Sequence, residues 1–107
     1  MKKLLEYIKL LATEEYWRAA EKFGECNNSS HESYAVIKEE FDEALWALGE
    51  AESNLNDFWE AVKRNDTNGQ KMALESLEMN AMYTASEVVQ VGAMAQKALR
   101  TTERGFD

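Results

Sequence analysis

The fold of this chain is decided by residues 34–62, which read YAVIKEEFDEALWALGEAESNLNDFWEAV. Apolar side chains recur here at the three- and four-residue steps of an α-helix and form one stripe: Tyr34, Ile37, Phe41, Leu48, Leu55, Trp59 and Val62. Ser29 and Glu32 have the spacing of a capping box, and residues 65–69 are rich in turn formers. We therefore predict a helix over about 31–64 with this stripe facing the core.

Two further helices are predicted on either side of this stretch. The first, over about 2–23, has an apolar stripe of Leu4, Ile8, Leu11, Tyr16, Ala19 and Phe23 and ends at Gly24. The third, over about 70–103, has a stripe of Leu74, Leu77, Ala81, Val88, Gly92, Ala95 and Leu99. The sequence thus predicts a single all-α domain over residues 1–107. We expect an antiparallel bundle of three or four helices, completed by oligomerisation.

The prediction of an oligomer comes from surplus apolar side chains. Three helices cannot fully cover one another's apolar faces, and several large side chains lie off the main stripes: Trp17, Trp46, Met79, Met82 and Met94. A second copy of the chain would bury such surface. A homodimer is therefore expected, with a homotetramer as the alternative. A coiled-coil scaffold is less favoured, because apolar residues do not keep strict heptads along the whole chain.

The composition narrows the class of protein. Twelve basic and twenty acidic residues give a net charge of −8, which argues against binding of a nucleic acid polymer, whose partners present basic faces. Cys26 is the only cysteine, so neither a disulfide nor a zinc site is expected within one chain. Glu6 and Lys9 interrupt the apolar start, which speaks against a signal peptide, and no stretch has transmembrane length. We expect a cytoplasmic protein with no membrane partner.

Two acidic patterns on the predicted helices suggest a metal site. Glu40 and Glu43 are three residues apart, as are Glu87 and Gln90, so each pair lies on one side of its helix. Two such pairs on facing helices would supply the oxygen ligands that Mg²⁺ requires, with Mn²⁺ as the expected substitute.

Each pattern also has a plainer interpretation. A charge run such as 39–43 commonly just solvates a helix. Glu87 is the only charged residue between Asn80 and Gln96, so it needs a partner, and either a metal ion or Arg18 of the first helix would serve.

The stretches SHESYAVIKEEFDE (30–43) and EVVQVGAMA (87–95) resemble the MazG-like nucleotide pyrophosphohydrolases. These belong to the all-α nucleoside triphosphate pyrophosphohydrolase superfamily, and the similarity to its small phage and bacterial members covers roughly residues 30–100. The family motif is E-E-x-x-E followed, after a spacer, by E-x-x-D. Glu39, Glu40 and Glu43 match its first half, while Glu87 matches the second half and Gln90 stands in place of the aspartate.

The resemblance implies packed helices assembled as dimers or dimers of dimers. It also implies Mg²⁺-dependent hydrolysis of a (deoxy)nucleoside triphosphate to the monophosphate and pyrophosphate. Glu40, Glu43 and Glu87 would then be metal ligands, with the Gln90 amide oxygen as a weaker one. Glu39 would hold the metal or activate the attacking water.

The remaining candidates concern phosphate binding. Charge on the leaving pyrophosphate needs cations, for which Lys38, Lys97 and Arg100 are the candidates. His31, the only histidine, is expected at the surface, and the absence of Glu-x-x-His pairs argues against a ferritin-like di-iron site. Gln90 and the abundance of Met and Trp keep an alternative open: a non-catalytic helical oligomerisation module derived from the same family.

Overall fold

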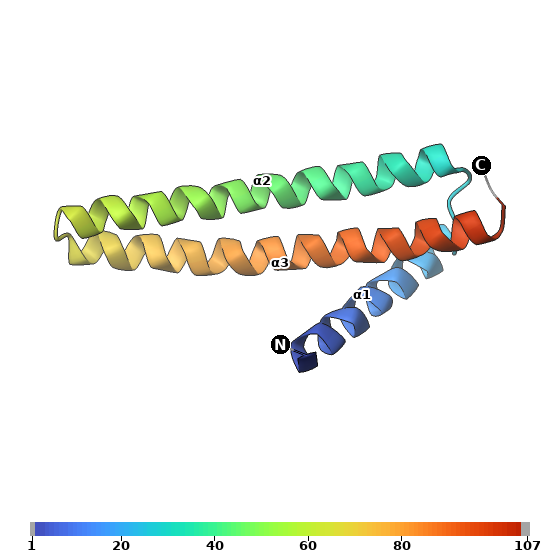
Figure 1. Cartoon of the computed structure of the whole chain (residues 1–107), viewed down its shortest axis with the longest axis horizontal. Coiled ribbons are helices and arrows are strands. Elements are labelled where there is room, and N and C mark those ends of the chain that lie inside the picture. Colours follow the sequence, from blue (N-terminus) through green and yellow to red (C-terminus); the bar gives the residue numbers. More distant parts are fainter. Residues whose placement is uncertain (1, 106–107) are drawn as a thin grey trace. The chain divides into compact units, whose positions relative to one another are not determined.

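A computed structural model describes residues 2–105 and contains three α-helices and no strand in that range (Figure 1). Helix α1 spans Lys2–Phe23, α2 spans Ser30–Lys63 and α3 spans Thr67–Glu103. The prediction of an all-α fold is confirmed. Residues 1, 106 and 107, at the ends of the predicted domain, lie outside the described residues. Within the described residues, no helix combines the length and apolarity needed to cross a membrane.

Local capping interactions set where α2 and α3 begin. The Ser29 hydroxyl accepts a hydrogen bond from the Glu32 amide at 3.1 Å, as the capping box predicts, while the Glu32 carboxylate reaches the Asn28 side chain. Asp66 caps α3 in the same way, because its Oδ1 accepts from the Gly69 amide at 2.8 Å. This cap starts α3 at Thr67, three residues before the predicted start.

The chain divides into two compact units, and their boundaries fall inside α2 and α3. The first unit contains the residues up to Phe41 and those from Val88 onward, and the second contains Asp42–Glu87. The first unit therefore combines α1 with the beginning of α2 and the end of α3. The second unit is formed by the remaining halves of α2 and α3.

The core of the first unit is centred on Tyr16. This side chain is fully buried and packs in one cluster with the buried Ala20, Ala93 and Met94, and its hydroxyl donates to the Glu25 carbonyl at 2.8 Å. A Cβ at Gly92 would lie 3.6 Å from the Ala12 Cβ, an ordinary van der Waals contact, so α1 passes close to α3 at this position. Met94, which the sequence placed off the main stripe, belongs to this core, so that prediction is wrong.

A buried polar network ties the loop after α1 to the end of α3. The Asn27 amide donates to the Thr101 hydroxyl and the Asn27 side chain donates to Ser33, both at 2.8 Å. The Thr101 hydroxyl in turn donates to the Lys97 carbonyl. These bonds satisfy polar groups that are buried in the first unit and that would be costly to leave unpaired.

The second unit is an antiparallel helical hairpin (Figure 1). The chain turns at Asn65, whose φ of 57° is the left-handed conformation that Asn tolerates well. The buried side chains in this hairpin are alanines: Ala44, Ala47, Ala51, Ala61 and Ala73. The side-chain amides of Asn54 and Asn80 form a hydrogen bond between the two helices.

The predicted core stripe of α2 is wrong for the single chain. Its large side chains are mostly exposed, including Phe41, Leu48, Leu55 and Trp59. In the second unit, the buried and half-buried positions instead include 44, 47, 51, 54, 58 and 61 on α2 and 70, 73, 77, 80, 84 and 87 on α3. These positions alternate steps of three and four residues, the coiled-coil spacing, but carry mainly small and polar residues, with Phe58 and Leu77 as the large apolar exceptions. We call them the alanine seam; small side chains there let the helices approach closely and leave the large ones on the flanks.

Candidate metal centre

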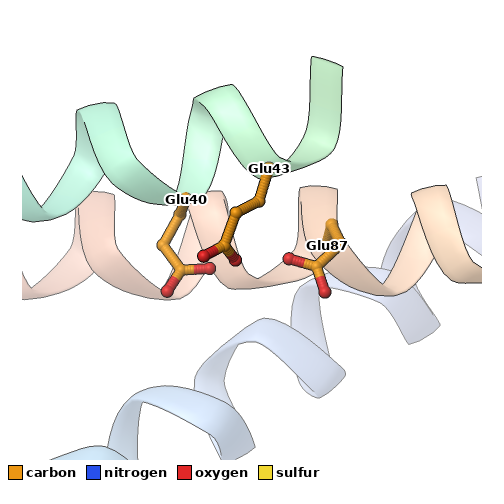
Figure 2. Close-up of side chains that lie close together, drawn as sticks. All are labelled: Glu40, Glu43 and Glu87. Atoms are coloured by element: carbon orange, nitrogen blue, oxygen red, sulfur yellow. The ribbon is translucent and has the colours of Figure 1, made fainter. Parts of the chain in front are cut away.

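Three carboxyl groups meet where the sequence predicted a metal site. One carboxylate oxygen from each of Glu40, Glu43 and Glu87 lies within 4.8 Å of the other two. Figure 2 shows the Glu43 carboxyl group between that of Glu40, which is also on α2, and that of Glu87 on α3. Glu43 and Glu87 both belong to the second unit, and Glu40 lies one helical turn before Glu43 on α2. We call these three residues the carboxylate cluster.

Helical spacing explains how the cluster forms. Glu40 and Glu43 are neighbours on α2 because three residues advance the helix by almost one turn. Glu87 occupies the last alanine-seam position of the second unit, which turns its side chain toward α2. Glu40 and Glu87 are half-buried and Glu43 is exposed, so the site is open to solvent on one side.

The cluster suits a hard divalent cation. Mg²⁺ binds oxygen at about 2.0–2.1 Å in an octahedron, which places ligand oxygens about 3 to 4 Å apart. Oxygens that already lie within 4.8 Å of one another need only small side-chain rotations to reach that spacing. A bound cation would also offset the mutual repulsion of the three negative charges.

Tyr83 is a member of this site that the sequence prediction missed. Its side chain hydrogen-bonds to Glu87, and its pKa is raised above the ordinary value of 10.0. The main cause is the negative charge of Glu87, followed by that hydrogen bond, partial desolvation and the charge of Glu43. The sequence contains a signal for this contact, because Tyr83 and Glu87 are four residues apart and therefore neighbours on one side of the helix.

Gln90, the predicted fourth ligand, has a different partner. Its side-chain amide donates to the Glu15 carboxylate on α1 at 2.8 Å. Arg18, the alternative partner expected for Glu87, forms an ion pair with the same Glu15 at 2.9 Å. The family's aspartate position is therefore occupied here by a residue whose amide is bonded to α1.

The other predicted site residues lie outside the carboxylate cluster. Glu39 and Lys38 are exposed on α2, and Lys97 is buried in the first unit with 7% of its surface exposed. The Arg100 guanidinium lies over the rings of Tyr16 and Trp17, at 4.6 and 4.9 Å from their centres. His31 is exposed, as expected.

Comparison with known proteins adds no relative: no protein-family model, curated protein or solved structure matches this chain. The chemistry of the carboxylate cluster is therefore the basis for a functional assignment.

Proposed function

We propose that this protein is an Mg²⁺-dependent nucleotide pyrophosphohydrolase. Its substrate would be a (deoxy)nucleoside triphosphate and its products the monophosphate and pyrophosphate. The observation that carries the proposal is the carboxylate cluster, built from Glu40 and Glu43 of the E-E-x-x-E pattern on α2 and from Glu87 on α3. A nucleotide substrate and a single cysteine make the cytoplasm the proposed location.

In this proposal Glu40, Glu43 and Glu87 would hold the ion, which would supply positive charge against the phosphates and lower the pKa of a water molecule. Water adds to the α-phosphorus, and the bond from that phosphorus to the oxygen bridging the β-phosphate breaks. Glu39 is the proposed acceptor of the water proton. It is exposed beside Glu40 and lies about 100° around α2 from it, so its carboxylate is available for a role other than metal ligation.

The cations proposed for the pyrophosphate are Lys38, Lys97 and Arg100. Lys38 is exposed and precedes Glu40 by two residues on α2. Arg100 is held against two aromatic rings, and Lys97 is largely buried. Of the three, Lys38 therefore has the most accessible side chain for a phosphate group.

The experiment is pyrophosphate release against a panel of ribo- and deoxynucleoside triphosphates, with Mg²⁺ or with EDTA. Glu40→Gln removes one charge from the cluster, and Glu50→Gln is the matched control, because Glu50 is an exposed acid on the same helix outside it. We expect release that needs Mg²⁺, is abolished in Glu40→Gln and is unchanged in Glu50→Gln. Equal release by the wild type and Glu40→Gln would contradict the proposal.

The alternative is a non-catalytic helical interaction module. It is favoured by Gln90, whose amide is bonded to Glu15 and whose side chain carries no charge for a cation. A ligand that binds only the folded state stabilises it, by about 2.7 kcal/mol at one hundred times its Kd. The alternative therefore predicts that the melting temperature does not change when Mg²⁺ or nucleotides are added. The pyrophosphohydrolase proposal predicts that they raise the melting temperature by several degrees and that this increase is lost in Glu40→Gln.

A further inference from the structure

A hydrogen bond joins α1 to α3 one helical turn beyond the carboxylate cluster. The Gln90 side-chain amide on α3 donates to Glu15 Oε2 on α1 at 2.8 Å, and both residues are half-buried. Gln90 follows Glu87 by three residues, so these two side chains are neighbours on one side of α3. Glu15 and Gln90 belong to the first unit, as does Glu40 of the cluster. The bond therefore fixes a polar side chain next to a member of the cluster.

The chemistry of the two groups sets the orientation of the Gln90 amide. An ionised carboxylate only accepts hydrogen bonds, so the amide nitrogen, and not the amide oxygen, must face Glu15. The amide group is planar, and its oxygen Oε1 is therefore directed away from Glu15. Gln90 thus carries an oxygen of fixed direction one turn from Glu87.

Glu15 is itself held by a second partner. Its other oxygen, Oε1, forms an ion pair with the Arg18 guanidinium at 2.9 Å, one turn further along α1. The Glu15 side chain is only 22% exposed, so it lies mostly against protein. Each oxygen of this carboxylate has its own donor, which limits its rotation and keeps Oε2 on the Gln90 nitrogen.

The bond from Gln90 to Glu15 differs from the other contacts between α1 and α3. The Tyr16 core packs the two helices together, and Gln96 Nε2 donates to Thr13 Oγ1 at 3.3 Å. These contacts are neutral, whereas the Gln90 bond ends on a carboxylate. A hydrogen bond to an ionised group is about twice as strong as a neutral one, and it polarises the donor. The electron density of the Gln90 amide is thereby shifted toward its oxygen.

We propose that Glu15 is a positioning residue for the metal centre, which makes the Gln90 amide oxygen an effective ligand for an ion held by the carboxylate cluster. A carboxylate that accepts from a metal-binding histidine fixes its orientation and raises its basicity. Glu15 acts on the Gln90 amide by the same principle and offsets the absence of charge on that side chain. The inference rests on the proposed function, because it needs a metal ion at the cluster.

The first test measures binding of Mn²⁺, the expected substitute for Mg²⁺, by electron paramagnetic resonance of the unbound ion, and needs no enzymatic activity. Glu15→Gln keeps the size of the side chain and removes its charge. Glu14→Gln is the matched control, because Glu14 is an exposed acid beside it on α1. Thr13→Val removes a neutral bond between α1 and α3. We expect binding to be weaker by about 10- to 100-fold in Glu15→Gln and to change by about twofold or less in both controls.

An exchange of the two side chains provides the second test. Glu15→Gln combined with Gln90→Glu reverses the bond, because the new amide on α1 donates to the new carboxylate on α3, and the net charge stays the same. This double variant should fold and should bind Mn²⁺ at least as tightly as the wild type, since the residue at the ligand position is then a carboxylate. Binding about tenfold weaker than that of the wild type would overturn the inference.

Two results of the Mn²⁺ titrations would refute the positioning role of Glu15 and leave the metal centre intact. In the first, Glu40→Gln abolishes binding while Glu15→Gln binds as the wild type does. In the second, Thr13→Val weakens binding as much as Glu15→Gln, which would mean that Glu15 only holds α1 against α3. A wild type that binds no Mn²⁺ would instead show that the carboxylate cluster is not a metal site, and the proposed function would fail with it.

Discussion

At the scale of single residues, the interaction between Tyr83 and Glu87 is the most specific feature of the candidate site. The phenol forms a hydrogen bond with Glu87, and the carboxylates of Glu87 and Glu43 oppose ionisation of the phenol. Both effects raise the pKa of Tyr83, because the protonated phenol is the favoured form beside negative charge. The titration of this side chain therefore reports the charge of the carboxylate cluster.

Removing the Glu87 charge should lower the pKa of Tyr83 toward 10.0. Glu87→Gln eliminates the largest cause of the raised value and leaves only the smaller effects of desolvation and Glu43. Ultraviolet titration of the tyrosines, with Tyr83→Phe used to subtract the other three, measures the change. Glu78→Gln, an exposed acid on the same helix, should leave the titration unaltered. Identical curves for wild type and Glu87→Gln would show that the two side chains do not interact in solution.

Tyr83 also makes the stability of the folded protein depend on pH. Because the folded pKa of Tyr83 is raised, its contribution to stability is fully present below pH 10 and is lost as pH rises through the folded pKa. Tyr16 contributes in the same direction, since burial raises its pKa although the nearby Arg100 lowers it. We therefore expect both tyrosines to make the folded protein less stable at alkaline pH.

At the scale of the helices, the alanine seam decides how α2 and α3 pack. Ala47 has 1% of its surface exposed and lies in the middle of the seam. A larger side chain there cannot point into solvent, so the helices would have to separate. The packing of this hairpin therefore depends on small volume rather than on apolar character.

Ala47→Leu should destabilise the protein by about 1–3 kcal/mol through overpacking. The matched control is Ala35→Leu, at an exposed position of the same helix, where the cost should stay within about 0.5 kcal/mol. Urea denaturation followed by circular dichroism provides both free energies of unfolding. An Ala47→Leu variant as stable as the wild type would mean that the large apolar side chains of α2, such as Leu48 and Leu55, face α3 in place of the alanine seam.

At the scale of the whole molecule, net charge opposes the homodimer that the surplus apolar side chains predict. Each copy carries −8, so two copies repel each other. The apolar groove of the second unit that Leu45, Leu48, Leu55 and Leu77 line, here called the leucine groove, contains only Glu52 as a charged residue. The apolar contacts are insensitive to this repulsion, while charges at the rim of the groove are screened over about 10 Å at 0.1 M salt.

Added salt should therefore strengthen the dimer. We expect the dissociation constant measured by sedimentation to fall several-fold between about 0.05 M and 0.5 M sodium chloride, because the Debye length falls about threefold over this range. Glu52→Gln should tighten association at low salt and reduce this dependence. Weaker association at high salt would indicate an interface held by ion pairs and not by the leucine groove.

Much of this protein can be predicted from its sequence, because the features concerned are local. The three helices, the Ser29 cap and the proximity of Glu40 to Glu43 all depend on residues within one or two helical turns. Helix propensity and the 3.6-residue repeat act at that range, so no knowledge of distant contacts is required. The Asp66 cap is also a local feature, but the sequence pattern predicts a start of α3 three residues after the observed one.

Only the tertiary structure decided which faces of the helices meet. The periodicity of the large apolar residues of α2 predicts that they form the core. The structure leaves most of them at the surface, because α2 and α3 approach each other along alanines. Contact between helices therefore depends on side-chain volume as well as on hydrophobicity. The approach of Glu87 to Glu43, the bond from Gln90 to Glu15, and the placement of Arg100 over Tyr16 and Trp17 join residues far apart in sequence. The sequence thus determined the helices and the spacing of their carboxylates, while the packing of the helices determined which side chains lie within reach of one another.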